Sequence, residues 1–254
     1  MSKVVTVRDV KIGVGAPKVI VPIVERGYSE IIGKVESFEG RPIDMVEWRA
    51  DFFDELFDTE RVLYTLSGLR VTLENTPLLF TFRTKGEGGD KEITWDAYTA
   101  LNKAVAESGK ADLVDVEVFS GDGVARENIN NIHRVGCLAV GSNHDFHATP
   151  PAGELVSRLR KIQDMGADIA KVAVMPTCTA DVLALLSATA EMYEKYATCP
   201  LITMSMSAKG VISRLSGEVF GSAATFGSVG KGSAPGQIPV EQLAQALDIL
   251  HDAL

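Results

Sequence analysis

One lysine stands inside an otherwise apolar stretch in the second half of the chain. Lys171 belongs to the run Ile169–Met175, whose other members are all apolar. Burying an ammonium group is costly unless the group is paired or deprotonated. If the run is a strand, Lys171 and Ala173 lie on the same face, and the small alanine leaves space beside the amine. Lys171 is therefore either a member of a structural ion pair or an amine that can attack a carbonyl carbon.

Two of the four histidines lie in one short stretch, Ser142–His147. Because histidine titrates near neutral pH, we assign His144 the role of a general acid and base, and we interpret His147 as a loop or supporting residue. A metal site is the alternative. It is less favoured for two reasons. Strand alternation separates the two histidines, and no other His or Cys lies near a predicted strand end, whereas zinc sites favour such ligands. The sequence thus predicts acid/base chemistry and no metal site.

Arginines and carboxylates follow the apolar stretches at several points. Arg49, Arg83 and Arg214 could supply a cationic cluster for an anionic ligand, because the guanidinium fork suits a carboxylate. Asp115 and Glu117 share one strand face, and we interpret them as partners that position the cations. A pair of catalytic carboxylates, as in glycosidases, is the alternative. Each charged residue could also belong to a structural ion pair.

The elements that must position these residues repeat along the chain. Apolar strand-like runs alternate with segments of helical periodicity. One helical segment follows Thr149 and Pro150, which we interpret as an N-cap and a first-turn proline, and another follows Pro239. The eight strand-like runs are Val19–Val24, Met45–Trp48, Leu78–Arg83, Leu113–Phe119, Cys137–Ser142, Ile169–Met175, Leu201–Met206 and Ser222–Val229.

Eight strands alternating with helices predict an α/β fold, a single-domain (β/α)8 TIM barrel that spans residues 1–254. We expect residues 1–17 to contain a short N-terminal β-hairpin that closes the base of the barrel. A doubly wound open sheet is the competing fold. No dinucleotide motif supports it, because Gly13–Pro17 lacks the last glycine of GxGxxG and precedes a strand. Gly230–Ser233 likewise lacks the spacing of a phosphate-binding P-loop.

Composition and charge exclude several classes of partner. The net charge of −9 and the pI near 5.0 argue against non-specific binding to nucleic acid or to an anionic membrane, since both need a broad basic surface. No apolar run approaches the roughly 20 residues that span a membrane, and the amino terminus lacks a long apolar segment, so we expect a cytoplasmic protein. The three cysteines are too few and too irregularly spaced for a disulfide framework or a metal site.

The carboxyl ends of the strands, and the loops that follow them, build the active site in a barrel of this kind. Lys171, His144 and the arginines would meet there. A buried amine beside an acid/base histidine and a cationic cluster predicts Schiff-base chemistry on a small anionic ketone or aldehyde. An aldolase that acts on a sugar phosphate and a non-catalytic metabolite-binding barrel are the alternatives.

Several stretches resemble one known family along nearly the whole chain. The type I 3-dehydroquinate dehydratases, the Schiff-base-forming class of the shikimate pathway, carry motifs similar to EWRAD, FTFRTKGEGG, SNHDFH, IAKVAVMP, GVISRLSGEVFGSAATFGS and SAPGQ. The resemblance implies a lyase that converts 3-dehydroquinate to 3-dehydroshikimate in chorismate and aromatic amino acid biosynthesis. It also implies that the protein needs no metal or organic cofactor and forms a homodimer.

The resemblance assigns a role to individual residues. Lys171 would form an imine with the substrate ketone, His144 would move the protons, and Glu87 would orient His144 and tune it electrostatically. We expect burial and the neighbouring arginines to favour the neutral amine that attack requires. The remaining implied residues bind substrate: Glu47, Arg49, Arg83, Arg214, Ser233 and Gln237 hold the carboxylate and hydroxyls, and Phe146, Met206 and Phe226 form apolar walls.

Two positions depart from the family pattern. Pro22 stands where a small hydroxyl residue is expected, which concerns one substrate hydrogen bond. Ala170 precedes the lysine where proline is frequent, and it should matter little because it faces away from the barrel interior.

Overall fold

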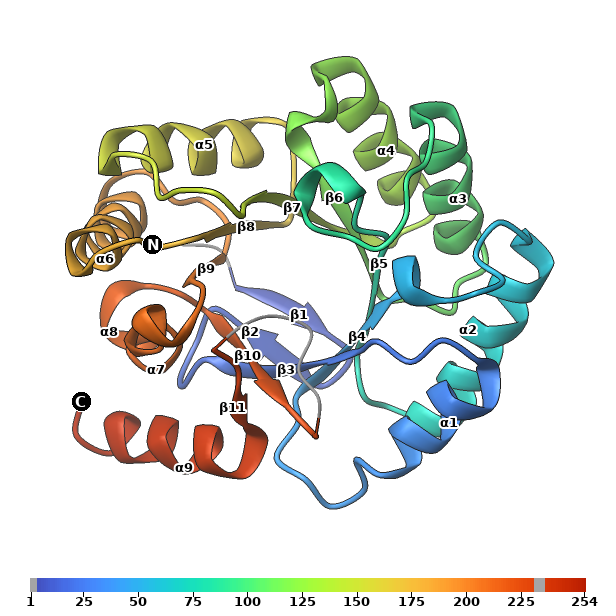
Figure 1. The fold of residues 1–254 in the computed structure, drawn as a ribbon, viewed down its shortest axis with the longest axis horizontal. Helices are drawn as coiled ribbons and strands as arrows, with labels where there is room; N and C mark the ends of the chain where they lie inside the picture. The colour runs from blue at the N-terminus through green and yellow to red at the C-terminus, as the bar shows by residue number, and fades with distance from the viewer. Residues whose placement is uncertain (1–3, 231–235) are drawn as a thin grey trace.

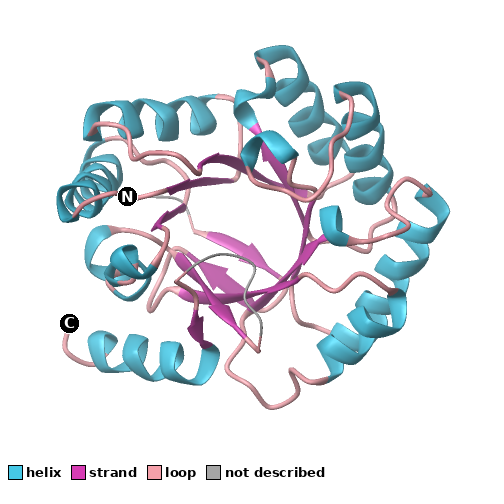
Figure 2. Ribbon diagram, in the orientation of Figure 1, coloured by secondary structure: helices cyan, strands magenta, loops and turns pink. Residues whose placement is uncertain are grey.

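A ring of parallel strands forms the centre of the molecule, and helices surround it (Figure 1, Figure 2). The computed structural model describes residues 4–230 and 236–254. Within these residues the large sheet has nine strands in the order β11-β10-β3-β4-β5-β6-β7-β8-β9, and every neighbouring pair is parallel. The strands are β3 (Lys18–Ile23), β4 (Met45–Arg49), β5 (Leu78–Thr81), β6 (Leu113–Glu117), β7 (Leu138–Asp145), β8 (Ile169–Val174), β9 (Leu201–Ser205), β10 (Ala224–Ser228) and β11 (Ile238–Pro239).

The sheet closes on itself between β9 and β10. A bridge pairs Leu201 with Ser222, and the N–H of Ala223 donates to the Leu201 carbonyl oxygen at 2.7 Å. The N–H of Thr203 donates to Ser222 Oγ at 3.0 Å. Closure satisfies backbone groups that an open edge would expose. The predicted (β/α)8 barrel is therefore confirmed, and the open-sheet alternative is wrong.

Helices follow most strands and cover the outside of the ring. The α-helices are α1 (Tyr28–Glu36), α2 (Thr59–Leu73), α3 (Trp95–Glu107), α4 (Asp122–Arg134), α5 (Ala152–Asp164), α6 (Thr179–Lys195), α7 (Ile212–Leu215), α8 (Gly217–Phe220) and α9 (Val240–His251). Short 3-10 helices are η1 (Ala50–Phe52), η2 (Lys85–Glu87), η3 (Val118–Ser120) and η4 (Ala208–Gly210). Along the described ranges, none of the helices combines the length and the apolar character that crossing a membrane requires.

Alternate residues of each strand face two different apolar cores. The inner core fills the barrel and includes Met45 and Ile169. The outer core lies between strands and helices and includes Trp48 and Val172. Burial of an aliphatic side chain such as Ile169 stabilises the fold by roughly 1.5–3 kcal/mol. The expected alternation in β8 is confirmed, because Ala173 belongs to the inner core whereas its neighbours along the strand belong to the outer one.

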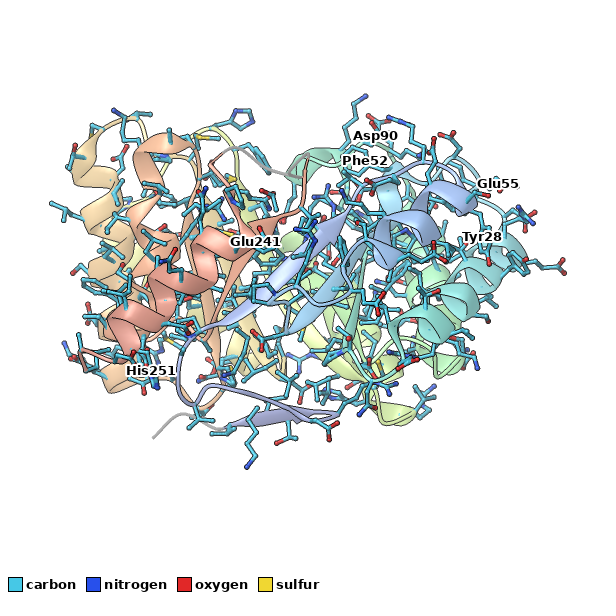
Figure 3. All side chains as sticks on the ribbon, turned by 90° about the horizontal axis from the view of Figure 1, so that it is seen from below. Tyr28, Phe52, Glu55, Asp90, Glu241 and His251 are labelled. Atoms are coloured by element: carbon cyan, nitrogen blue, oxygen red, sulfur yellow. The ribbon has the colours of Figure 1, made fainter. Side chains whose placement is uncertain are left out.

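The N-terminal hairpin consists of β1 (Val5–Val7) and β2 (Val10–Ile12), which pair antiparallel. Val7 and Ile12 are buried in the inner core of the barrel. Figure 3 shows the hairpin at one end of the barrel, whereas Phe52 and Asp90, which follow β4 and β5, lie at the opposite end. The hairpin therefore contributes side chains to the end of the barrel away from the carboxyl ends of the strands.

Several boundaries differ from the sequence prediction, and those of β7 and α5 differ near the carboxyl ends of the strands. Strand β7 continues three residues beyond Ser142 to Asp145, because His144 and Asp145 keep pairing with β8. Helix α5 begins at Ala152, so the predicted cap at Thr149 is wrong. Thr149 instead donates its hydroxyl to the carbonyl oxygen of Met175 at 3.0 Å, which ties the β7–α5 loop to the end of β8.

Candidate active site

Lys171 lies on the inner face of β8 and is 3% exposed. Its Nζ is 3.2 Å from Glu47 Oε1 on β4 and 3.4 Å from Asp115 Oδ2 on β6. The same Nζ lies 4.8 Å from the centroid of the Phe226 ring. Two carboxylates and an aromatic face therefore contact the amine. The arginines that were expected beside it lie elsewhere on the wall of the same cavity.

Arg83 follows β5 and joins three carboxylates at the centre of the site. Its Nη2 donates to Asp115 Oδ1 at 2.7 Å, and its Nη1 donates to Glu117 Oε1 at 3.0 Å and to Glu87 Oε2 at 3.3 Å. Burial works against the guanidinium charge, but Asp115 and Glu117 raise the pKa of Arg83 well above its ordinary value. Arg83 is therefore a buried, permanent cation, and the interpretation of Asp115 and Glu117 as its partners is confirmed.

His144 is held by the carboxylate of Glu87, the last residue of η2. Glu87 Oε2 accepts the backbone N–H of His144 at 2.9 Å and lies 2.9 Å from His144 Nδ1. Asn143 Nδ2 donates to the other carboxylate oxygen at 3.1 Å. Because Nδ1 faces Glu87, Nε2 is the ring nitrogen that can exchange a proton with a ligand. The contact fixes the position of the imidazole, and the protonation state of Glu87 sets its tautomer.

Burial shifts the pKa of both members of this pair. Burial raises the pKa of Glu87 to about 8, and the nearby Glu117 adds to the rise while Arg83 opposes it. Burial also holds the pKa of His144 well below its usual range, and the positive charges of Arg83 and Lys171 act in the same direction. His144 is therefore a neutral imidazole near pH 7, and the pair loses a proton near pH 8.

Gly88 allows an aromatic side chain to close one wall of the site. Its φ of 86° is in the left-handed region, and a Cβ at this position would lie 2.3 Å from the Phe146 ring. The Phe146 ring stacks on the imidazole of His144, with 6.5 Å between centroids and 23° between planes. A glycine at the end of η2 thus lets Glu87 and Phe146 approach the histidine from two sides.

Arg49 is oriented by Asp51, two residues along the chain. Its Nε and Nη2 donate to the two Asp51 carboxylate oxygens, both at 2.8 Å. The guanidinium also lies 5.1 Å from the centroid of the Phe52 ring. Arg49 therefore pairs with Asp51, and Glu47 pairs with Lys171, so Glu47 and Arg49 are not partners of each other. This bidentate clasp aims the guanidinium at the cavity.

One cavity collects nearly all the residues that the sequence marked. Arg214, which follows η4, is 1% exposed, and burial lowers its pKa to about 10. Ser233 lies outside the described residues, and His147 is exposed beyond the end of β7. The cavity is lined by Glu47, Arg49, Arg83, Glu87, His144, Phe146, Lys171, Ala173, Met204, Met206, Arg214, Phe226 and Gln237.

Three residues that support the site were not predicted from the sequence. Asp51 orients Arg49, Ser142 Oγ accepts from Arg83 at 3.0 Å, and Asn143 supports Glu87. All three lie inside the stretches EWRAD and SNHDFH, and their place beside the predicted site residues is the sequence signal that could have identified them. No group of three or more His, Cys, Asp or Glu side chains suited to a metal ion occurs in the part of the chain that the structure describes.

Comparison with known proteins supports one family throughout the chain. The sequence model of the family described as Type I 3-dehydroquinase matches residues 19–253. The chain belongs to the type I 3-dehydroquinases. Similar proteins are the 3-dehydroquinate dehydratases of Escherichia coli O157:H7 (strain EC4115 / EHEC) and Salmonella agona (strain SL483), which are 51% and 50% identical over 251 residues, 99% of this chain and 100% of each relative.

A solved structure of the family has the same fold. The crystal structure of type I 3-dehydroquinate dehydratase from Clostridium difficile, which contains covalently modified comenic acid, is 47% identical and has a TM-score of 0.97. The match covers 100% of both chains. The family resemblance inferred from the motifs is therefore confirmed, and each of those motifs contributes at least one described residue to a single cavity.

Proposed function

We propose that this type I 3-dehydroquinase converts 3-dehydroquinate to 3-dehydroshikimate through an imine at Lys171, with His144 moving the protons. The observation that carries the proposal is the shared cavity, in which a buried amine, a histidine and three arginines face one space. An amine suits attack on a ketone, histidine suits proton transfer, and arginine suits the substrate carboxylate. The reaction is a step of the shikimate pathway toward chorismate and the aromatic amino acids.

Imine formation begins with the loss of a proton from the ammonium group of Lys171. Glu47 and Asp115, at 3.2 and 3.4 Å from Nζ, are close enough to accept it. The neutral nitrogen then adds to the ketone carbon, the carboxyl group that took the proton returns it to the carbinolamine hydroxyl, and that oxygen leaves as water to give a protonated imine. The same carboxylates stabilise the positive charge that develops on the nitrogen.

Elimination follows from the electron demand of the protonated imine. His144 Nε2 takes a proton from the carbon beside the imine, and the C–H electron pair moves toward the nitrogen to form an enamine. The enamine expels the hydroxyl on the next carbon, His144 returns its proton to that oxygen, and water leaves. Hydrolysis of the conjugated imine releases the enone and regenerates Lys171. Ionised Glu87 accepts from Nδ1–H and so holds the imidazole in the tautomer whose Nε2 can take the substrate proton.

The remaining side chains bind the substrate. Ser233 shares in binding on the strength of the family resemblance. We assign polar contacts to Glu47, Arg49, Arg83, Arg214 and Gln237, and apolar walls to Phe146, Met206 and Phe226.

Borohydride trapping tests the covalent step. The protein is incubated with 3-dehydroquinate and sodium borohydride, digested, and the peptides are weighed by mass spectrometry. We expect an adduct on the peptide that contains Lys171 and none in a Lys171→Met variant. Turnover without any adduct would reject the imine, and carbon–carbon cleavage of phosphorylated sugars with no reaction of 3-dehydroquinate would instead identify an aldolase.

We also propose that the enzyme acts in the cytoplasm as a homodimer. The family resemblance supports the dimer, and a small-molecule biosynthetic step supports the compartment. Light scattering after gel filtration should give twice the mass of the 27.2 kDa chain. A monomer mass at micromolar concentration, or recovery of the activity in the membrane fraction of the cell, would contradict these assignments.

A further inference from the structure

Arg158 and Asn143 connect the Glu87–His144 pair to helix α5. Asn143 Nδ2 donates to Glu87 Oε1 at 3.1 Å, and Asn143 Oδ1 accepts from Arg158 Nη1 at 3.0 Å. Arg158 is itself anchored, because its Nε donates to Glu154 Oε1 on the same helix at 2.9 Å. A continuous series of contacts thus runs from the outer helix through the end of β7 to the carboxylate that holds the histidine.

The amide of Asn143 can in principle be placed in two ways, because its oxygen and its NH2 group have nearly the same shape. Arginine carries donors and no acceptor, so the amide oxygen must face Arg158. The NH2 group then faces Glu87. The reversed amide would place its oxygen against the Glu87 carboxylate and its NH2 against the guanidinium, and both contacts would be repulsive. Arg158 therefore selects the orientation in which Asn143 donates to Glu87.

We propose that Arg158 is a positioning residue for the dehydration, which locks Asn143 as a hydrogen-bond donor and so favours the ionised Glu87 that orients His144. The proposal rests on the proposed function, because it assigns the support of the same proton-transfer pair. Arg158 is absent from the described residues that line the cavity. Its influence on the reaction would therefore pass through its contacts at the end of β7, which are Asn143 and, 3.6 Å from Nη1, Asp145 Oδ2, and not through substrate contact.

The charges around the pair define what the loss of Arg158 would change. Arg83 and the hydrogen bond from Asn143 both lower the pKa of Glu87, against burial and the neighbouring carboxylates, which raise it. Loss of the correctly oriented Asn143 amide would remove one of the two contributions that lower the pKa of Glu87. The charged groups that face Glu87 and His144 are Arg49, Arg83, Asp115, Glu117 and Lys171, and none of them would be altered.

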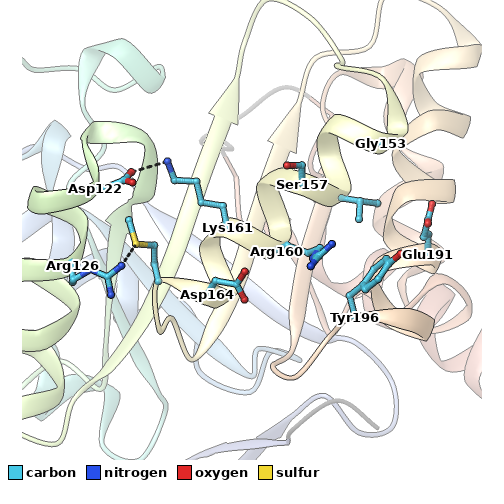
Figure 4. Close-up of a pocket in the computed structure, with 11 residues that line it drawn as sticks. Asp122, Arg126, Gly153, Ser157, Arg160, Lys161, Asp164, Glu191 and Tyr196 are labelled. Atoms are coloured by element: carbon cyan, nitrogen blue, oxygen red, sulfur yellow. Dashed lines mark hydrogen bonds and ion pairs between the residues drawn. The ribbon is translucent and has the colours of Figure 1, made fainter.

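Arg160 provides a matched control on the same helix. Its guanidinium lies 4.7 Å from the centroid of the Tyr196 ring, on the outside of the barrel. Figure 4 shows both residues in a groove lined by α4, α5 and α6, together with the ion pair between Lys161 and Asp122. An Arg160→Met substitution removes the same number of charges and donors from α5 without touching Asn143.

The test compares the pH dependence of kcat and KM for 3-dehydroquinate in Arg158→Met, Arg158→Lys and Arg160→Met. For Arg158→Met we expect kcat at pH 7 to fall about threefold to tenfold, with the acid limb of the kcat profile displaced upward by about 0.5–1 pH unit and KM within about twofold of wild type. Arg158→Lys, which keeps a donor facing Asn143, should recover most of the loss. Arg160→Met should match wild type.

An Arg158→Met profile with an unmoved acid limb would overturn the proposal, and so would a rise in KM that accounts for the whole loss of kcat/KM. If Arg158→Met fails to fold, as judged by its Tm, Asn143→Asp provides the second test. This variant keeps an acceptor for Arg158 but places a carboxylate against Glu87, so the acid limb must move upward by at least as much. Wild-type protein that does not dehydrate 3-dehydroquinate would reject the proposed function itself, which is a separate outcome.

Discussion

The turnover number should rise with pH through about 8, because Glu87 must lose its proton before His144 can act as a base. A protonated Glu87 donates to Nδ1 and leaves the imidazole proton on Nε2, the nitrogen that must accept the substrate proton. The ionised carboxylate accepts from Nδ1–H, in the 2.9 Å contact, and leaves the Nε2 lone pair available. The direction of the pH dependence therefore follows from the tautomer.

The size of the effect follows from the raised pKa of Glu87, which burial moves to about 8. The ionised fraction is then about one half at pH 8 and about one tenth at pH 7. We expect kcat at pH 7 to be about tenfold below its plateau above pH 9. The titration of His144 adds no limb in this range, because burial and the positive charges of Arg83 and Lys171 hold its pKa well below the usual value.

The assay is the ultraviolet absorbance of the conjugated enone product, followed from about pH 6 to pH 9.5 in wild type and in Glu87→Gln. Glutamine keeps the shape of the side chain but cannot ionise, so the variant should lose the limb and turn over about 10²-fold more slowly than the wild-type plateau. Thermal unfolding at each pH separates catalysis from stability. A wild-type rate that is flat between pH 6 and 8, or a Glu87→Gln variant with an unmoved limb, would refute the reasoning.

Three further predictions concern the site and the fold. His144→Ala should reduce turnover by at least about 10²-fold while borohydride still captures an imine at Lys171, and wild-type turnover in this variant would contradict the assignment. Asp115→Asn should lower the free energy of unfolding in urea by about 3–5 kcal/mol, because buried Arg83 and Lys171 each lose a carboxylate partner. A change below about 1 kcal/mol would show that these ion pairs are dispensable. We propose that the chain is one domain that includes its N-terminal hairpin. Ile12→Ala should then lower the free energy of unfolding by about 2–5 kcal/mol in a single unfolding transition and leave kcat unchanged. A separate unfolding transition for the hairpin would disprove this.

Most strands could be predicted because their residues are apolar on both faces. In β8, one face packs inside the barrel and the other packs under the helices, so the run Ile169–Met175 is nearly continuous in apolar residues. The end of β7 could not be located in this way. Its last three residues are polar, and they remain in the strand because they pair with β8 and not because of their own propensity.

Lys171, His144 and the arginines could be singled out individually, because a lysine in an apolar strand and polar residues at strand ends are unusual in type and position, whereas the family resemblance implied most of the other site residues. Their partners could not be assigned. Arg49 pairs with Asp51, whereas Glu47, two residues earlier, pairs with Lys171 across the barrel. Such choices depend on the register between strands, which a periodic pattern leaves open.

The sequence alone determined that this chain builds a (β/α)8 barrel, that Lys171 is an interior amine, and that the motifs are those of the type I 3-dehydroquinases. Local periodicity and residue type contain that information. The tertiary structure alone decided that two carboxylates contact Lys171 and that the Glu87 carboxyl group faces Nδ1 of His144. The reason is physical: the charge state of a buried group depends on distances of a few ångströms to residues far away in sequence, and folding sets those distances.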